Sequence, residues 1–249
     1  MNREEESLGE FSGAGNTSRR HKMTTLFPFA ANPSDWQELL ADKDKHWRTG
    51  YSAKTLAHSW TAAKGFPPEV AAALATSKDP LLVGIEPVLG IPEFKVPLPG
   101  GDRASQNDIF VLARSHSGPV SIMVEGKVEE SFGPTLENWL VDASLGKRTR
   151  LAFLLKTLGL DKEPDGLIRY QLLHRAASAV IVGEQYRAAA AVLMVHSFSE
   201  RHTGLSDLQA FAQLFGTHLV TGTVQRLSGN TAVPLFAVWV HGDPRFLTL

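Results

Sequence analysis

Cysteine is absent from the 249-residue chain. Its absence excludes disulfides, thiolate-bound zinc, iron–sulfur clusters and a cysteine nucleophile. A metal ion would therefore be held by carboxylates, carbonyl oxygens or some of the nine histidines. This donor set favours Mg²⁺ or Mn²⁺. A chain without cysteine is also compatible with the reducing cytoplasm, where we expect the protein to be found.

Long hydrophobic runs are also lacking. No stretch approaches the roughly 20 apolar residues that a membrane-spanning helix needs. The longest apolar run, residues 188–195, is short enough for a buried strand. The first residues contain no apolar segment of signal-peptide length. We therefore expect no membrane partner.

Neither sign of charge is in excess. The 25 Lys and Arg residues against 26 Asp and Glu residues give a formal net charge of −1. Bulk attraction to nucleic acid or to a membrane is therefore excluded, although a local basic groove is not. The chain also has no Gly-x-Ser-x-Gly elbow, no phosphate-binding Walker loop and no dinucleotide fingerprint, so it lacks the signatures of those enzyme classes.

The composition is that of a globular protein, with 43% hydrophobic and 20% charged residues. Residues 1–22 are rich in Gly, Ser and Glu, and we predict that they form a flexible tail. We assign residues 23–249 to a single domain. Helical spacing predicts helices over residues 35–42, capped by Ser34, and over residues 52–63, 66–75, 135–142, 147–158, 168–186 and 207–215.

Apolar stretches bounded by turns predict strands over residues 93–97, 108–113, 120–128, 189–196 and 232–241. The first three strands are joined by short turns, which indicates an antiparallel meander. The later alternation of helix and strand indicates crossovers and parallel pairing. The expected fold class is therefore α/β, with a mixed central sheet flanked by helices and an N-terminal helical extension.

A pair of charged residues interrupts the apolar strand 120–128. Glu125 and Lys127 are two positions apart, so they project from the same face of the strand. Gly126 between them allows a ligand to approach the backbone closely. Asp108 opens the preceding strand. If the two strands pair through the turn near Ser117, Asp108 lies beside Glu125 and Lys127 at one end of the sheet.

These residues resemble the motif of the PD-(D/E)XK phosphodiesterase superfamily, which has the restriction-endonuclease-like fold. Its pattern is an acid, then Asp or Glu, any residue and Lys, on two adjacent strands. Here it reads Asp108 followed by Glu125-Gly126-Lys127, without the proline that usually precedes the first acid. The wider segment, over most of residues 33–249, also resembles a bacterial family of uncharacterised proteins assigned to this superfamily. The superfamily order of helix, three strands, helix and strand agrees with the elements predicted above.

The resemblance implies a nuclease or related hydrolase. Asp108, Glu125, the Gly126 carbonyl and a further acid, for which Glu86 is the leading candidate, would bind Mg²⁺ or Mn²⁺. Lys127 would stabilise developing charge or orient water. Gln171 would match a glutamine that the next helix contributes in several members. The implied partner is nucleic acid, with DNA favoured over RNA.

Other interpretations stay open at this point. Glu125 and Lys127 could form a solvated charge pair, and Gln171 could belong to a solvent-facing stripe with His174 and Arg175. The protein could also keep the fold without catalysis, as a binding or partner subunit, or act on a substrate other than nucleic acid. Aromatic residues that could stack on bases are equally suited to the core; they are Trp47, Trp60 and Tyr170.

Overall fold

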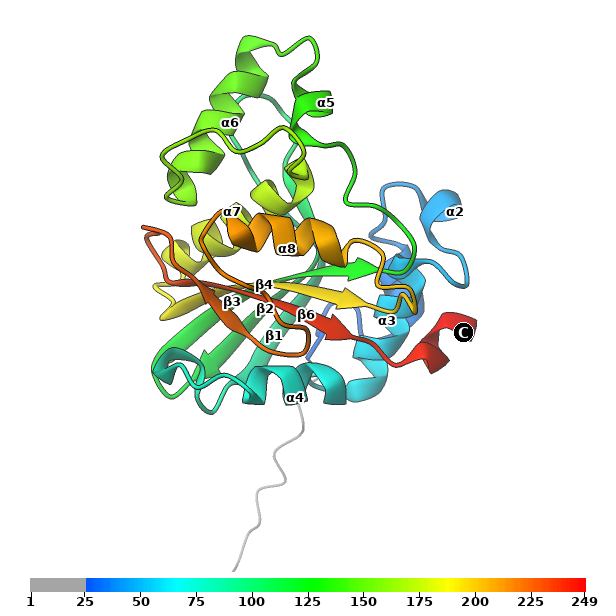
Figure 1. The fold of residues 1–249 in the computed structure, drawn as a ribbon. Helices are drawn as coiled ribbons and strands as arrows, with labels where there is room; N and C mark the ends of the chain where they lie inside the picture. Colours follow the sequence, from blue (N-terminus) through cyan, green and yellow to red (C-terminus); the bar gives the residue numbers. More distant parts are fainter. Residues whose placement is uncertain (1–25) are drawn as a thin grey trace, which may run out of the picture.

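The computed structural model describes residues 26–249, and it is built around one central sheet (Figure 1). The predicted tail, residues 1–22, lies outside the described residues. The six strands are β1 (Glu86–Val96), β2 (Ser105–Ser115), β3 (Gly118–Lys127), β4 (Ala190–Ser197), β5 (Gln225–Leu227) and β6 (Leu235–His241). Their order across the sheet is β1-β2-β3-β4-β6-β5.

The pairing of the strands is mixed, as the sequence predicts. β1, β2 and β3 form an antiparallel meander, and β2 turns into β3 at the pair Ser115–Gly118. β3, β4 and β6 are parallel, and β5 adds an antiparallel strand at the edge. The chain is therefore a mixed α/β protein with a six-stranded sheet, and the predicted meander and parallel crossovers are both confirmed.

The helices follow the predicted positions, with shifts at their ends. They are α1 (Pro33–Gln37), α2 (Lys43–His46), α3 (Ser52–Ala63), α4 (Pro68–Ala75), α5 (Leu136–Leu140), α6 (Leu145–Thr157), α7 (Tyr170–Gln185) and α8 (Leu205–Gln213). Short 3₁₀ turns cover Pro80–Leu82 and Pro244–Thr248. The prediction for residues 52–63 matches α3, whereas α2 and β5, with four and three residues, were too short for a periodic pattern to detect.

Several predicted boundaries were wrong, and two of them have a clear structural cause. The first helix begins at Pro33 rather than at residue 35, because a capping box between Asn32 and Asp35 starts it instead of Ser34. The first strand begins at Glu86 rather than at residue 93. Two prolines, Pro87 and Pro92, interrupt its pattern, but an edge strand tolerates proline because one side of its backbone needs no partner.

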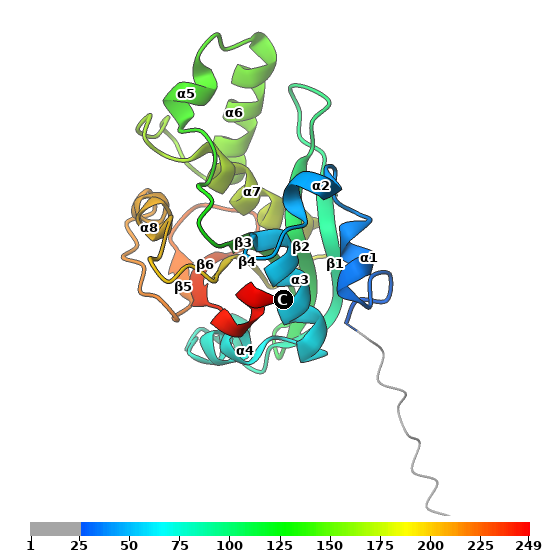
Figure 2. The ribbon, with the colours of Figure 1, turned by 90° about the vertical axis from the view of Figure 1, so that its right-hand side faces the viewer.

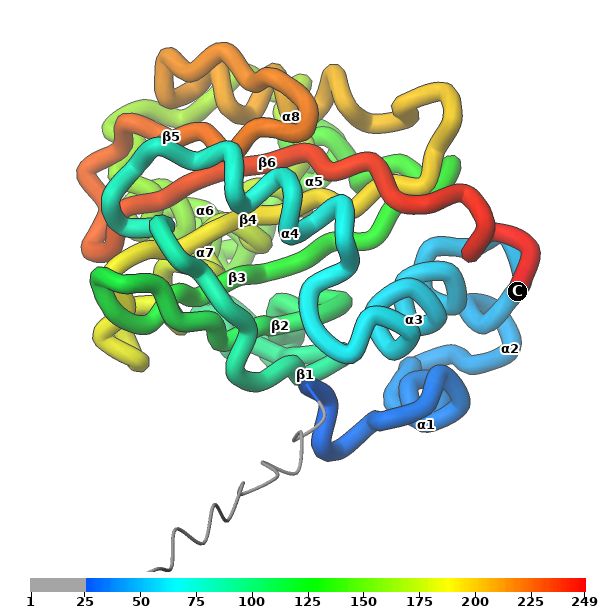
Figure 3. The backbone as a smooth tube through the Cα atoms, turned by 90° about the horizontal axis from the view of Figure 1, so that it is seen from below, coloured from blue at the N-terminus to red at the C-terminus, as the bar shows by residue number. Residues whose placement is uncertain are grey.

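Helices cover both faces of the sheet (Figures 1 and 2). α7 and α8 lie on one face, and α5 and α6 extend outward beyond α7. The hydrophobic core on the α7 face of the sheet includes Phe110, Met123, Leu172 and Trp239. α3 and α4 lie on the opposite face, as the view from below shows (Figure 3), over a second core that includes Trp60, Val70, Ile122 and Phe236. Because α7 begins where β3 ends, polar residues of both elements meet at one end of the sheet.

Among residues 26–249, no helix has the length and apolar character needed to cross a membrane.

Candidate functional site

The Glu125 carboxylate is the centre of a buried polar cluster. Its Oε1 accepts hydrogen bonds from Lys127 Nζ at 2.8 Å and from Gln171 Nε2 at 2.7 Å, and its Oε2 accepts one from Arg175 Nε at 2.6 Å. β3 supplies Glu125 and Lys127 from one face because they are two residues apart. α7 supplies Gln171 and Arg175 from one face because they are four residues apart.

Burial makes these interactions strong. The side chains of Glu125 and Lys127 are 3% and 6% exposed, so the alternative of a solvated charge pair is wrong. Burial opposes ionisation of Glu125, but the charges of Arg175 and Lys127 outweigh it and lower the pKa of this carboxyl to about 2. Gln171 and Arg175 point at Glu125, so their face of α7 is not a solvent-facing stripe.

Asp108 lies on β2, one residue before Ile109, where β2 begins to pair with β3. Ile109 pairs with Val124, so Asp108 occupies the position opposite Glu125. Its Oδ2 accepts a 2.7 Å hydrogen bond from the Gly126 amide. Burial, followed by repulsion from Glu125, raises the pKa of Asp108 well above its usual value. Gly126 therefore meets the site through its N–H, and Asp108 lies beside Glu125 without a salt bridge of its own within the described residues.

A further acid at this end of the sheet is Glu93 on β1, which the sequence interpretation missed. Pro92 pairs with Ile109 and Phe94 with Asn107, so Glu93 lies opposite Asp108. Glu93 has a φ of +52° and hydrogen-bonds the Gln106 amide. Burial raises its pKa against the opposing effect of the Gln106 hydrogen bond.

Glu86, the predicted further acid, is not part of this cluster. It is exposed and pairs with Arg114 at the other end of β1 and β2. Glu86 and Glu93 are seven residues apart, which corresponds to about 23 Å along a strand. The sequence interpretation was wrong here because β1 starts earlier than its pattern indicated, which moves Glu86 away from the start of β2. The antiparallel register, once known, identifies Glu93.

Two pockets of opposite character border the cluster. The acidic pocket, of about 290 Å³, contains Glu93 and Asp108 and is also lined by Leu40, Ala41, His46, Ser52, Ala53, Gln106 and Arg175. The basic pocket, of about 440 Å³, contains Lys127 and Arg175 and no acid; the rest of its lining is Ala104, Gln106, Ser131, Phe132, Gly133, Pro134, Tyr170, Gln171 and His174. Gln106 and Arg175 line both pockets, so the cluster separates a space suited to a cation from a space suited to an anion.

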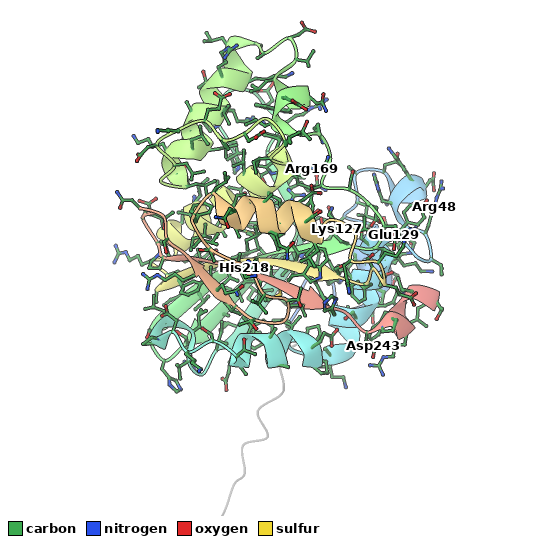
Figure 4. All side chains as sticks on the ribbon, in the orientation of Figure 1. Arg48, Lys127, Glu129, Arg169, His218 and Asp243 are labelled. Carbon is green, nitrogen blue, oxygen red and sulfur yellow. The ribbon has the colours of Figure 1, made fainter. Side chains whose placement is uncertain are left out.

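Neighbouring residues have other partners. Glu129, which follows β3 at the same end of the sheet (Figure 4), is bonded to Ser199, Arg201 and Thr203 and does not contact Glu125. Trp60 is fully buried in the core between α3 and the sheet, so it is not available to stack on a base. Tyr170 stacks on Trp139 at 3.9 Å and lines the basic pocket.

The carboxylates at this end of the sheet are the donors that a hard divalent ion would use. Within residues 26–249, no group of three or more His, Asp or Glu side chains is arranged to hold a metal. Mg²⁺ needs fewer, since it commonly keeps several waters and binds one or two carboxylates. Asp108 has one carboxylate oxygen, Oδ1, without a hydrogen-bond partner in the described part of the chain, and the Asp108 residue lines the acidic pocket together with Glu93. The residues present therefore fit a largely hydrated magnesium-type ion.

The chain belongs to the family described as a domain of unknown function (DUF6946), whose model matches residues 29–244. No curated protein and no solved structure matched the chain.

Proposed function

We propose that this protein is a metal-dependent phosphodiesterase of the PD-(D/E)XK class that hydrolyses nucleic acid. The observation that carries the proposal is the buried cluster of Asp108, Glu125 and Lys127 between an acidic and a basic pocket. An acid pair beside a lysine provides for a cation and for a phosphate at adjacent positions, which is what phosphodiester hydrolysis needs.

The arrangement of the elements supports the restriction-endonuclease-like part of the proposal. A helix precedes a three-stranded antiparallel meander, α7 crosses over, and β4 returns parallel to β3. α5 and α6 are inserted between β3 and α7. This order is the one that the resemblance implies, with the motif acids on the second and third strands.

Charge balance supports the pairing of a metal with a phosphate. Burial raises the pKa of Glu93 and of Asp108, and a bound divalent ion would favour their ionised forms. With Glu125 also ionised, three carboxylates would then face the two cations Lys127 and Arg175, which gives −1 before the charge of the ion is added. A divalent ion would reverse this to +1. The loaded site would then attract an anionic phosphodiester more strongly than the site without the ion. Metal and substrate are therefore expected to bind in a linked manner.

The chain's own residues have separable roles in this proposal. Asp108, with Glu93 beside it, would hold the ion, which supplies a Lewis acid for the phosphoryl oxygens. Glu125 holds Lys127 Nζ at 2.8 Å, so the ammonium is fixed at the edge of the basic pocket. From there Lys127 can stabilise the phosphoryl charge or orient a water. Gln171 and Arg175 are positioning residues because they fix the Glu125 carboxylate from α7.

The test is cleavage of plasmid and labelled oligonucleotides, DNA and RNA, with Mg²⁺ or Mn²⁺. The wild type is expected to cleave, and Asp108→Ala and Lys127→Ala are each expected to lose at least about a hundredfold in rate. Glu129→Gln is the matched control, because Glu129 lies at the same sheet end without facing the cluster. Equal rates in the folded wild type, Asp108→Ala and Lys127→Ala would remove the assignment.

A second function, a non-catalytic binding or partner subunit, is favoured by one observation. Both oxygens of Glu125 are already bonded to side-chain donors, so this carboxylate is not free for a metal unless Arg175 or Lys127 moves. Such a network can serve the fold alone. Absence of divalent-ion binding by calorimetry, together with a stable partner in pull-down experiments, would support this function against the first.

A further inference from the structure

A third pocket continues from the basic pocket, and we call it the arginine pocket. It has a volume of about 190 Å³ and is lined by Leu98, Arg103, Ala104, Ser105, Trp139, Arg150, Tyr170 and His174. It shares Ala104, Tyr170 and His174 with the basic pocket. The two pockets are therefore adjacent. Lys127 lines the basic pocket, and two arginines line the arginine pocket.

No acid of the described residues compensates the positive charge of the arginine pocket. Among residues 26–249, its lining contains Arg103 and Arg150 and no Asp or Glu. Arg103 is exposed and makes no side-chain hydrogen bond or ion pair within the described residues. By contrast, Lys127 and Arg175 both bond Glu125, so much of their charge is already balanced.

Arg150 is held in place by backbone carbonyls rather than by an acid. Its Nε donates to Pro99 O at 2.9 Å, and one terminal nitrogen donates to Leu98 O at 3.3 Å and Gly101 O at 3.0 Å. The Tyr170 side chain also hydrogen-bonds Arg150. All these partners are neutral, so the guanidinium keeps its full charge, and the five donors of an arginine leave one for a ligand oxygen.

The floor of the pocket is neutral and polar. His174 Nδ1 lies 2.8 Å from Ser105 Oγ, and burial followed by the nearby Arg175 charge lowers the pKa of His174 to about 3. The Tyr170 ring lies 4.9 Å from the His174 ring and stacks on Trp139 with an interplanar angle of 8°. The pocket thus combines two cations, a neutral imidazole and an aromatic wall, a lining suited to a phosphate group.

We propose that the arginine pocket binds a second phosphate group of the nucleic-acid strand, beyond the phosphate placed at Lys127. The inference rests on the proposed function. It restricts the substrate to a nucleic-acid strand that places one phosphate in the basic pocket and another in the arginine pocket. Two sources supply the same chemistry, an internal phosphodiester and a terminal phosphate monoester. The terminal monoester carries more charge than an internal diester.

The experiment measures binding of labelled single-stranded oligonucleotides by fluorescence anisotropy, without divalent ions, so that the strand stays intact. Three probes of one sequence carry a 5′-phosphate, a 3′-phosphate or no terminal phosphate. The variant is Arg103→Ala, which removes an exposed side chain without a partner in the described structure. The control is Arg148→Ala, since Arg148 is exposed on α6, two residues from Arg150, and lines none of the three pockets.

Arg103→Ala is expected to weaken binding about tenfold relative to Arg148→Ala. It should also reduce the slope of log affinity against log salt by about 0.7, the value for one phosphate contact on a single strand. Loss confined to one phosphorylated probe assigns the pocket to a terminal monoester, and equal loss on all three assigns it to an internal phosphodiester.

Equal affinity and equal salt slope in Arg103→Ala and Arg148→Ala would overturn the inference, as would a wild type that binds none of the probes. Cleavage by the wild type with Mg²⁺ is measured separately, so the nuclease proposal can stand while this inference fails. Conversely, metal-free binding that depends on Arg103 would survive a failure of the cleavage assay.

Discussion

Two buried polar clusters connect helices to the central sheet, one on each face. On the α7 face, Glu125 bonds Lys127, Gln171 and Arg175. On the opposite face, Trp60 Nε1 of α3 donates to His196 Nδ1 of β4 at 3.1 Å, and His196 Nε2 lies 3.1 Å from Glu69 Oε1 of α4. The clusters are close in the fold, because His196 pairs with Gly126 on the neighbouring strand.

The clusters differ in charge and in access. Burial lowers the pKa of His196, against the effect of Glu69, so the imidazole is neutral and both ring nitrogens have partners. None of the three pockets described above is lined by His196. The Glu125 cluster has unequal numbers of acids and cations and borders two pockets. Burial of polar groups is common to both clusters, whereas unbalanced charge beside a pocket distinguishes the Glu125 cluster, which is why the proposed function is placed there.

The largest effect expected from the difference between the two clusters is on the free energy of unfolding, and two matched substitutions measure it. Glu125→Gln removes the charge that balances Lys127 and Arg175, and it is expected to lower the free energy of unfolding by about 3–5 kcal/mol. Glu69→Gln keeps an oxygen that accepts the hydrogen bond of a neutral His196, and it is expected to cost less than about 1 kcal/mol. Urea unfolding of both variants at neutral pH measures the difference.

The proposed difference between the two clusters is contradicted if both substitutions lower the free energy of unfolding by the same amount. A small cost for Glu125→Gln would mean that the basic side chains reach water or lose their protons, and that the cluster is not held by charge. A large cost for Glu69→Gln would mean that His196 is charged, contrary to its burial.

The sequence predicted the parts of the site that depend on periodicity. Glu125 and Lys127 share a face because strands have a repeat of two, and Gln171 and Arg175 share a face because helices bring positions four apart together. Glu93 could not be placed, because it depends on the register of β1 and on a positive φ that no sequence pattern indicated. Glu86 was predicted to lie at the site because the start and register of β1 were not known from the sequence.

The arginine pocket was not predicted either. Arg103 lies in the connection between β1 and β2, whereas Arg150 lies on α6, and only the fold brings them together. The same holds for the fold as a whole: the order and type of the main elements followed from periodicity and turns, while short elements and exact strand ends depended on tertiary pairing.

A smaller effect is expected from His174, and it depends on pH. The unfolded chain protonates this histidine near pH 6.5 and the folded chain near pH 3. Between pH 6.5 and pH 3 the unfolded state therefore binds more protons than the folded state. The stability that neutral His174 contributes above pH 6.5 is lost as the pH falls through this range. At about 1.4 kcal/mol per pH unit, up to about 2 kcal/mol is lost by pH 5.

His174→Gln is expected to remove this part of the pH dependence, measured by urea unfolding between pH 7.5 and pH 5. His218→Gln is the control, because His218 is exposed (Figure 4) and should leave the profile unchanged. Parallel profiles for wild type and His174→Gln would show that His174 takes up its proton in the folded protein, and would place water or an acid beside it.

The most direct measurement is Mn²⁺ binding to the folded protein, followed by calorimetry or by the electron paramagnetic resonance signal of the free ion. The account predicts one site in the wild type, no site in Asp108→Asn, and unchanged binding in Glu69→Gln. Asp108→Asn should remain folded and be up to about 1 kcal/mol more stable without metal, because it removes a carboxyl whose charge is opposed by burial and then by repulsion from Glu125. Equal Mn²⁺ affinity in wild type and Asp108→Asn, or no binding by the wild type, would contradict the account.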